Sequence, residues 1–580
     1  STAIGAFALE AQNLTTATNT YNVAVGYDAG GDLTTGTENT LIGSLAGDAL
    51  TDADFNVALG VAALSTDLRG SRSVALGYAT LNSQNFTTAT NTYNTAVGHG
   101  AGNNVSTGFQ NTLIGGLAGD ALTDADYNTV VGKSALTADT LGSRAVAIGA
   151  FALEAQNFTT ATNSYNVAVG YDAGGDLTTG ISNTIIGGEA GDALTDADDN
   201  VAIGRLALSG DTLGSGNTAV GRGALKVQNF TTATFSYNAA VGYGAGGSVT
   251  TGKSNTLIGG LAGDALTDAD QNVAMGRSAL SADTLGSNST ALGYGTLTNQ
   301  NFTTATDSYN VAVGAFAGND VTTGAFNTLI GGLAGDALTD GFDNVAVGKG
   351  ALSTEDRGAK NTALGFEALL NQNAGTGNTH NTAVGAEAGS SITTGVQNTF
   401  VGSLTGDGTD DGSYNTAMGH TALSANCASG NTAVGWGAIA FTTGSQNVAM
   451  GNAAGYALTS GNSNILIGEN AGRTGNPGGN ITTGSNEICL GDSDVSEAHV
   501  QVDWTVASDQ RDKTDFTALD LGLDFVKALA PVTYKWDKRS KYGDKYADDY
   551  DLAAQTPDGT HKEDWLDIGF KAQAVQALEE

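Results

Sequence analysis

The sequence predicts a mostly β protein, in which a trimeric parallel β-solenoid (β-roll) shaft of 17- and 21-residue coils precedes a small α+β domain. Three observations predict this fold. Glycine accounts for 84 of 580 residues and proline for only 3, a glycine-ended motif recurs along most of the chain, and the composition changes near residue 492. A hydrophobic fraction of 40% with 14% charged residues excludes a disordered chain.

The repeat is an asparagine followed by a short apolar run and a glycine, as in residues 22–26 (Asn-Val-Ala-Val-Gly) and 217–221 (Asn-Thr-Ala-Val-Gly). It places 28 such glycines between Gly5 and Gly491. Intervals of 21, 17, 17 and 17 residues form a 72-residue super-repeat that persists to about residue 365, and irregular coils follow over 366–491. This periodicity is typical of solenoids, so residues 1–491 are predicted to form the shaft.

Each unit has room for one short strand with turns, and it is too short for a strand with a crossover helix. The asparagine suits a turn or a stacked amide ladder, and the glycine suits a positive φ or a close approach at a corner. Both alternating faces of the strand are apolar or small. One face should line the core of the coil, and the other should contact further copies of the chain around a symmetry axis. Stacking at about 4.8 Å per strand predicts a rod roughly 130 Å long.

The glycine repeat ends near residue 492. Residues 492–507 are predicted to form a connecting strand, because Val500, Val502, Trp504 and Val506 alternate along it. Residues 508–580 are predicted to form a separate domain, with a helix over 519–529 that ends before Pro531 and a strand over 532–536.

The charge balance excludes some classes of partner. The chain has 23 Lys and Arg residues against 59 Asp and Glu residues, a net charge of −36, which repels nucleic-acid phosphates and anionic membrane surfaces. No run of about 18 apolar residues predicts a membrane-spanning helix. Ser1 already lies inside a repeat, so we expect the sequence to be a fragment or a processed product.

Two stretches carry a family resemblance. Residues 146–149 (Val-Ala-Ile-Gly) and 447–451 (Asn-Val-Ala-Met-Gly) resemble the repeat in heads of trimeric autotransporter adhesins of the Yersinia adhesin kind. That resemblance covers about residues 1–491 and implies left-handed parallel β-rolls with three chains side by side. The adhesin heads have shorter coils, so longer turns are expected here.

The second resemblance lies in the C-terminal segment. Residues 508–513 (Ser-Asp-Gln-Arg-Asp-Lys), 521–536 and 568–573 (Ile-Gly-Phe-Lys-Ala-Gln) resemble the endosialidase-type intramolecular chaperone domain. This resemblance implies a domain at the C-terminus of phage tail fibres and tailspikes, which helps three chains to assemble and then often cuts itself off. It implies that Ser508 and Lys513 act together in self-cleavage. The family continues into long helices after the last motif, so the domain is expected to be abbreviated here or the chain to be longer.

The acidic turns are candidate metal sites. Asp48, Asp52 and Asp54 are two and four residues apart and could converge on Ca²⁺. Equivalent turns begin at Asp120, Asp192 and Asp264. A solvated acidic rim is the alternative that we favour, and no other cofactor is expected.

The 21-residue units carry four extra residues in the sequence Asn-Phe-Thr-Thr-Ala-Thr, and longer turns are where solenoids place binding surfaces. The phenylalanines of these turns are Phe86, Phe158, Phe230 and Phe302. They are expected to cover the end of the core, with receptor contact as the alternative.

These observations predict a structural virion protein, a homotrimeric phage tail fibre or appendage that mediates host-cell attachment. Its expected partners are other phage tail proteins and a host receptor, a glycan or an outer-membrane component, and its expected location is the extracellular virion. It is not expected to be an enzyme apart from self-cleavage. A bacterial trimeric surface adhesin is the alternative. A glycan-degrading tailspike is less favoured, because a carboxylate pair in near-perfect repeats would recur in every super-repeat.

Overall fold

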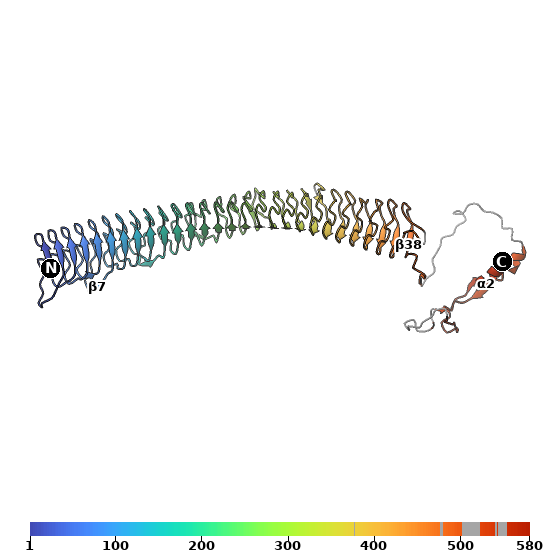
Figure 1. Ribbon diagram of the computed structural model, residues 1–580, viewed down its shortest axis with the longest axis horizontal. Helices are drawn as coiled ribbons and strands as arrows, with labels where there is room; N and C mark the ends of the chain where they lie inside the picture. The colour runs from blue at the N-terminus through green and yellow to red at the C-terminus, as the bar shows by residue number, and fades with distance from the viewer. Residues whose placement is uncertain (376, 476–478, 501–522, 540–541, 543–553, 580) are drawn as a thin grey trace. The chain divides into compact units, whose positions relative to one another are not determined.

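The computed structural model describes residues 1–375, 377–475, 479–500, 523–539, 542 and 554–579. The chain divides into two compact units, Ser1–Ser496 and Glu497–Glu580, which are described separately. The first unit is a solenoid, in which successive coils stack their strands into one row (Figure 1).

The solenoid contains a 28-stranded parallel sheet, with one three-residue strand from each coil. Its strands are β1 (Thr2–Ile4), β2 (Val23–Val25), β3 (Thr40–Ile42), β4 (Val57–Leu59), β6 (Val74–Leu76), β8 (Thr95–Val97), β9 (Thr112–Ile114), β10 (Thr129–Val131), β12 (Val146–Ile148), β14 (Val167–Val169), β15 (Thr184–Ile186), β16 (Val201–Ile203), β18 (Thr218–Val220), β20 (Ala239–Val241), β21 (Thr256–Ile258), β22 (Val273–Met275), β24 (Thr290–Leu292), β26 (Val311–Val313), β27 (Thr328–Ile330), β28 (Val345–Val347), β30 (Thr362–Leu364), β32 (Thr382–Val384), β33 (Thr399–Val401), β34 (Thr416–Met418), β35 (Thr432–Val434), β36 (Val448–Met450), β37 (Ile465–Ile467) and β38 (Ile488–Leu490).

The register of this sheet follows the sequence repeat. Val23 of β2 pairs with Thr40 of β3 across a 17-residue coil, and Thr2 of β1 pairs with Val23 across a 21-residue coil. The predicted parallel solenoid of 17- and 21-residue coils is therefore confirmed.

Each strand separates the core from the outer surface. In β2 the middle residue, Ala24, is fully buried, whereas Val23 and Val25 on either side of it remain partly exposed. The middle residues of the later strands are also buried and are mostly Ala or Leu, whereas Ala3 of β1, at the end of the stack, is exposed. Leucines from the turns, such as Leu33, are buried with them in the same core.

A ladder of buried asparagines runs beside the strands. The backbone N–H of Asn39 donates to Oδ1 of Asn22 in the preceding coil at 2.9 Å, and Asn39 Nδ2 donates to the carbonyl oxygen of Ala53 at 2.8 Å. Asn56 continues the ladder through Oδ1 of Asn39. Stacking thus satisfies polar groups that burial would otherwise leave unpaired, and the amide ladder expected from the sequence is present.

The longer coils add a second contact between neighbours. Pairs of short parallel strands form at the longer coils. They occur at four of the five 21-residue coils and at the 20-residue coil with which the irregular region begins. These strands are β5 (Gly70–Ser71) with β7 (Thr90–Asn91), β11 (Gly142–Ser143) with β13 (Thr162–Asn163), β17 (Gly214–Ser215) with β19 (Thr234–Phe235), β23 (Gly286–Ser287) with β25 (Thr306–Asp307), and β29 (Gly358–Ala359) with β31 (Gly377–Asn378).

The second unit is small and contains both helix and strand. Helix α1 spans Leu523–Ala528, strand β39 (Val532–Tyr534) pairs antiparallel with β40 (Asp567–Gly569), and helix α2 spans Ala572–Glu579. The predicted strand over 532–536 is thus shorter than expected, and residues 519–522 of the predicted helix lie outside the described residues. Residues 492–500 contain no strand, and the rest of the predicted connecting strand is not described.

Candidate functional site

The predicted self-cleavage pair, Ser508 and Lys513, lies outside the described residues. The described part of the same unit exposes much apolar surface. Trp565 is 61% exposed and Ile568 on β40 is 80% exposed. Large exposed apolar patches mark contact surfaces in soluble proteins.

Several contacts join the described parts of this unit. The ring of Tyr534 contacts Trp536 edge-on, with 5.4 Å between ring centroids. The backbone N–H of Glu563 donates to the carbonyl oxygen of Trp536 at 2.9 Å, and the Glu563 carboxylate lies 4.0 Å from Lys538 Nζ. The two contacts of Glu563 hold the segment before β40 against the segment after β39.

The acidic turns place their carboxylates in different surroundings. Asp54 Oδ1 accepts hydrogen bonds from the backbone N–H and the hydroxyl of Thr37, at 2.7 and 3.0 Å. Asp52 lies 3.5 Å from Arg69 Nε in the following coil. The third carboxylate, Asp48, has one buried oxygen without a hydrogen-bond partner.

The pKa of Asp48 is raised to about 6, mainly by burial and to a smaller extent by the neighbouring carboxylates of Asp28 and Asp32. The pKa values of the equivalent aspartates, Asp120, Asp192, Asp264 and Asp336, are raised mainly by the same desolvation. Within the described residues, no group of three or more His, Cys, Asp or Glu side chains is placed to hold a metal ion. Calcium binding by Asp48, Asp52 and Asp54 stays a prediction.

The phenylalanines of the longer turns are buried. Phe86, Phe158 and Phe230 are 7%, 6% and 4% exposed, respectively, so these rings cover the core as the favoured interpretation expected. Their side chains offer little surface to a receptor.

Sequence reasoning missed the group that holds these turns in place. The Asp139 carboxylate is fully buried and accepts hydrogen bonds from Gln156 Nε2 at 2.6 Å, from Phe158 N at 3.1 Å and from Gly142 N at 3.0 Å. Burial raises the pKa of Asp139, while these hydrogen bonds oppose the rise. Asp67 forms the same contacts 72 residues earlier, with Gln84 and Phe86. The sequence does contain a signal for this hydrogen-bonded pair, because each such aspartate precedes a glutamine by 17 residues, the length of one coil.

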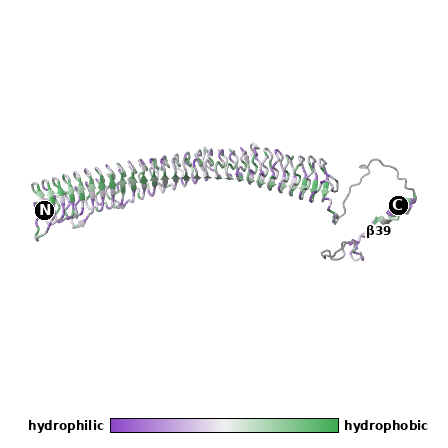
Figure 2. Cartoon of the chain, in the orientation of Figure 1, coloured by the Kyte–Doolittle hydropathy of each residue, from purple (hydrophilic) through white to green (hydrophobic). Residues whose placement is uncertain are grey.

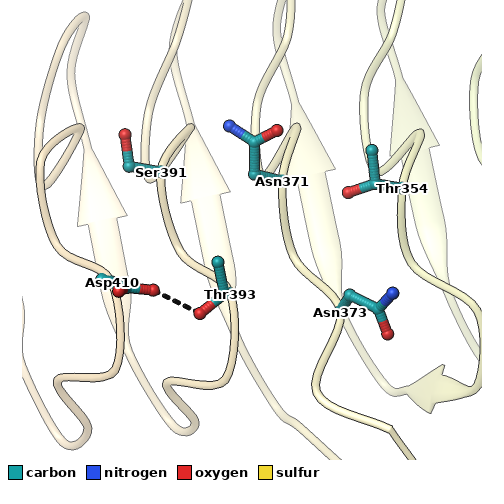
Figure 3. A pocket seen from close by; sticks show the side chains of 6 residues that line it. All are labelled: Thr354, Asn371, Asn373, Ser391, Thr393 and Asp410. Atoms are coloured by element: carbon teal, nitrogen blue, oxygen red, sulfur yellow. Dashed lines mark hydrogen bonds between the residues drawn. The ribbon is translucent and has the colours of Figure 1, made fainter.

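A shallow polar depression crosses four consecutive coils, from the last regular coil into the irregular part of the solenoid (Figure 3). It is lined by Thr354, Asn371, Asn373, Ser391, Thr393 and Asp410. Thr393 Oγ1 donates to the Asp410 carboxylate, and Thr354 Oγ1 donates to the carbonyl oxygen of Leu370 at 2.7 Å. The remaining hydroxyl and amide groups are the kind that hydrogen-bond to polar ligands.

The outer face of the 28-stranded sheet is apolar and uncovered in the chain. Ile258 is 37% exposed, Met275 42% and Met418 49%. Figure 2 shows the hydrophobic colour running along the row of strands. No helix among the described residues is long and apolar enough to span a membrane.

Comparison with known families connects this architecture with a class of proteins. Residues 508–579 match the family model described as the chaperone of endosialidase, which confirms the resemblance seen in the sequence. The matched family consists of self-cleaving chaperone domains, and the match, together with the solenoid, suggests a protein of the phage tail fibre or tailspike type. No curated protein and no solved structure matched the chain.

Proposed function

We propose that this protein is the shaft of a homotrimeric phage tail fibre, or a related virion appendage, that mediates attachment to the host cell. The observation that carries the proposal is the chaperone of endosialidase match over residues 508–579, directly after a 28-stranded solenoid. Repeating one short coil many times builds a long shaft, which suits a spacer between a virion and a surface.

Exposed apolar surface supports the trimeric state. The outer sheet face of the solenoid and the residues around β40 are both uncovered in a single chain. The proposed role of the C-terminal domain is to bring three chains together, so that these surfaces become buried. Stability is then inseparable from assembly.

Attachment requires a surface that binds a receptor. The proposed receptor is a glycan or an outer-membrane component, and other phage tail proteins are the proposed partners at the virion. The polar depression around Asn371 and Asn373 is the proposed contact, since its hydroxyl and amide groups match the hydroxyl groups of sugars.

Self-cleavage completes the proposal. The Ser508 hydroxyl would attack the carbonyl carbon of an adjacent peptide bond, while Lys513 takes its proton. The C–N bond would then break as Lys513 returns the proton to the leaving amine, and water would hydrolyse the resulting ester and free the Ser508 hydroxyl. Lysine has an ordinary pKa of about 10.4, so it acts as a base at neutral pH only where burial or a neighbouring cation favours its neutral form. Folding of the trimer would create that environment and would couple the cut to correct assembly.

The first test is whether the chain occurs in virions. Mass spectrometry of gradient-purified particles should detect solenoid peptides, and antibodies against the solenoid should label tail appendages and block adsorption to host cells. The chain should sediment as three copies. Absence from purified particles, with the chain found on a bacterial surface, would replace the proposal with a surface adhesin.

The second test concerns self-cleavage. The full-length gene product should be cut next to Ser508, as seen on a denaturing gel and by mass spectrometry of the fragments. Ser508→Ala and Lys513→Ala should each leave the chain intact while it remains trimeric. If the unaltered trimer is never cut, the domain serves only as a folding cap and the catalytic pair is wrong.

A further inference from the structure

A pocket in the fourth super-repeat, residues 221–292, holds two cations on an otherwise acidic solenoid. Arg222 and Lys226 come from the coil of β18, and Tyr243 comes from the coil of β20 that stacks on it. Asp264, in the next coil, also lines the pocket, which has a volume of about 260 Å³. Because the chain has only 23 Lys and Arg residues against 59 Asp and Glu residues, two cations in one pocket are a local departure from the charge of the shaft.

Both cations are available to a ligand. Arg222 and Lys226 are exposed, and among the described residues neither forms an ion pair with a carboxylate. Arg222 Cζ lies 5.7 Å from the centroid of the Tyr243 ring, which is itself 59% exposed. An arginine that lies over an aromatic ring can still donate the N–H groups in its guanidinium plane to a carboxylate or a phosphate.

The same place is filled in the first and third super-repeats. Phe151 of the third stands where the fourth has Gly223, and its ring contacts Tyr171 edge-on, with 5.8 Å between centroids. Phe7 makes the equivalent contact in the first, at 5.7 Å. A Cβ atom added to Gly223 would have no neighbour within 4 Å. Gly223 therefore leaves open, beside Tyr243, the space that a phenylalanine ring fills in the other two super-repeats.

The charges of this place also differ between super-repeats. The fourth carries Arg222, Lys226, Gly244, Ser248 and Asp264, where the third carries Ala150, Glu154, Asp172, Asp176 and Asp192 and the first carries Ala6, Glu10, Asp28, Asp32 and Asp48. Four carboxylates without a cation are thus replaced by two cations and one carboxylate, which changes the net charge from −4 to +1. No other super-repeat has Lys or Arg at either cation position. The fourth super-repeat alone therefore combines an open pocket with a charge that attracts anions.

We propose that this pocket binds one acidic sugar unit of a host glycan. Arg222 and Lys226 donate hydrogen bonds to the carboxylate of the sugar, and its ring lies against Tyr243. The hydroxyl groups of the sugar bond to Ser248 and Asp264, which also line the pocket. Pockets for drug-sized ligands begin at roughly 300 Å³, so this smaller one suits a single sugar unit. The inference rests on the proposed attachment to a glycan, and it adds the charge class of the ligand and a contact separate from the polar depression around Asn371.

Ligand-detected saturation-transfer NMR on the full chain tests the ligand class. Glucuronic acid is compared with glucose, and galacturonic acid with galactose, because each pair differs only by a carboxylate in place of a hydroxymethyl group. At least one acid should receive saturation from the protein, and its neutral partner should not. Raising the NaCl concentration from about 0.05 M to about 0.5 M should weaken the binding.

Three variants locate the binding. Arg222→Ala with Lys226→Glu installs residue types that the third super-repeat already accommodates, and it should weaken binding of the sugar acid by at least about tenfold. Gly223→Phe should block binding while both cations remain, and the backbone suits this change because φ is 68° at Gly223 and 64° at Phe151. Lys133→Ala is the matched control, since Lys133 is an exposed cation after a strand-ending glycine in another super-repeat. It should leave the affinity unchanged.

Several results would overturn the pocket. They are equal binding of a sugar acid and its neutral partner, no binding of either acid, and binding that survives both pocket variants. Inorganic phosphate that binds while neither sugar acid does would overturn the saccharide assignment. All of these leave the tail-fibre proposal to the virion test. Conversely, a chain that is absent from virions but still binds a sugar acid here would overturn the attachment role and not the pocket.

Discussion

The strand-ending glycines are fixed by the coil stacked against them. Gly221 has φ 133°, and a Cβ atom added to it would lie 2.3 Å from the carbonyl oxygen of Gly242 in the next coil. Two residues further on, Gly223 has φ 68°, but a Cβ atom there would have no neighbour within 4 Å. Packing against the next coil thus requires glycine at Gly221, whereas at Gly223 only the backbone conformation favours glycine.

These two positions give a matched pair of substitutions. Gly221→Ala should destabilise the fold by about 2–5 kcal/mol, because it combines an unfavourable φ with a clash against backbone. Gly223→Ala should cost about 1–2 kcal/mol, since only the left-handed conformation is penalised. Thermal unfolding followed by circular dichroism should rank the variants in that order, and equal melting temperatures would refute the role of coil contact.

The partly buried aspartates make stability depend on pH. The pKa of Asp48 and the pKa of Asp336 are both raised to about 6, against 3.8 for an ordinary aspartate, mainly by burial. The folded state therefore binds protons more strongly than the unfolded state between these values, and stability falls as pH rises through that window.

Lowering the pH from about 7 towards 4 should raise the melting temperature through these groups. The double variant Asp48→Asn with Asp336→Asn should melt higher than the parent at neutral pH and should lose part of this pH dependence. Melting should be followed at constant high salt, which suppresses the general effect of net charge. An unchanged pH profile in the double variant would show that these carboxylates are not responsible.

A single strand carries two surfaces with different roles. In β18, Ala219 is fully buried and its neighbour Val220 is partly exposed on the outer face. One belongs to the core of the coil, and the other belongs to the apolar outer face of the sheet.

Aspartate at each position should separate the two roles. Ala219→Asp buries an uncompensated charge and should cost about 3–5 kcal/mol of coil stability. Val220→Asp should leave the coil folded, with an unchanged β signal in circular dichroism, but weaken assembly in sedimentation experiments. If Val220→Asp assembles as well as the parent chain, the outer face is not an interface.

Net charge acts on the whole molecule. A charge of −36 per chain becomes −108 when three chains assemble, so self-repulsion opposes both folding and assembly. Sodium chloride at about 0.5 M should therefore raise the melting temperature by screening. A melting temperature that does not rise with salt would mean that the charges are spaced too widely to matter.

Calcium provides a separate test at the same scale. If Asp48, Asp52 and Asp54 bind Ca²⁺, micromolar Ca²⁺ should stabilise the chain at constant ionic strength, and Asp52→Asn should remove the effect. Titration calorimetry distinguishes this specific binding from screening. Without saturable heat, the acidic turns act as a solvated rim.

The sequence by itself determined the solenoid, because each coil repeats the same local instructions. The motif of an asparagine, a short apolar run and a glycine recurs every 17 or 21 residues. Stacking the coils in that register lets each buried asparagine bond to the next one along the ladder. The register of β2 on β3 follows from the same interval. The C-terminal domain was recognised for a similar reason, since its motifs are local and specific.

Tertiary structure decided which residues share an environment. Asp139 and Gln156 are 17 residues apart and become partners only because one coil lies on the next. Asp48, Asp52 and Asp54 are close in sequence, yet Asp54 bonds to Thr37 in the preceding coil while Asp52 pairs with Arg69 in the following one. The alternation of side chains along a strand predicts that the strand has two faces, but it does not predict which residues contact each face. Stacking fixed these environments, because each side chain's neighbours come from the coils above and below it.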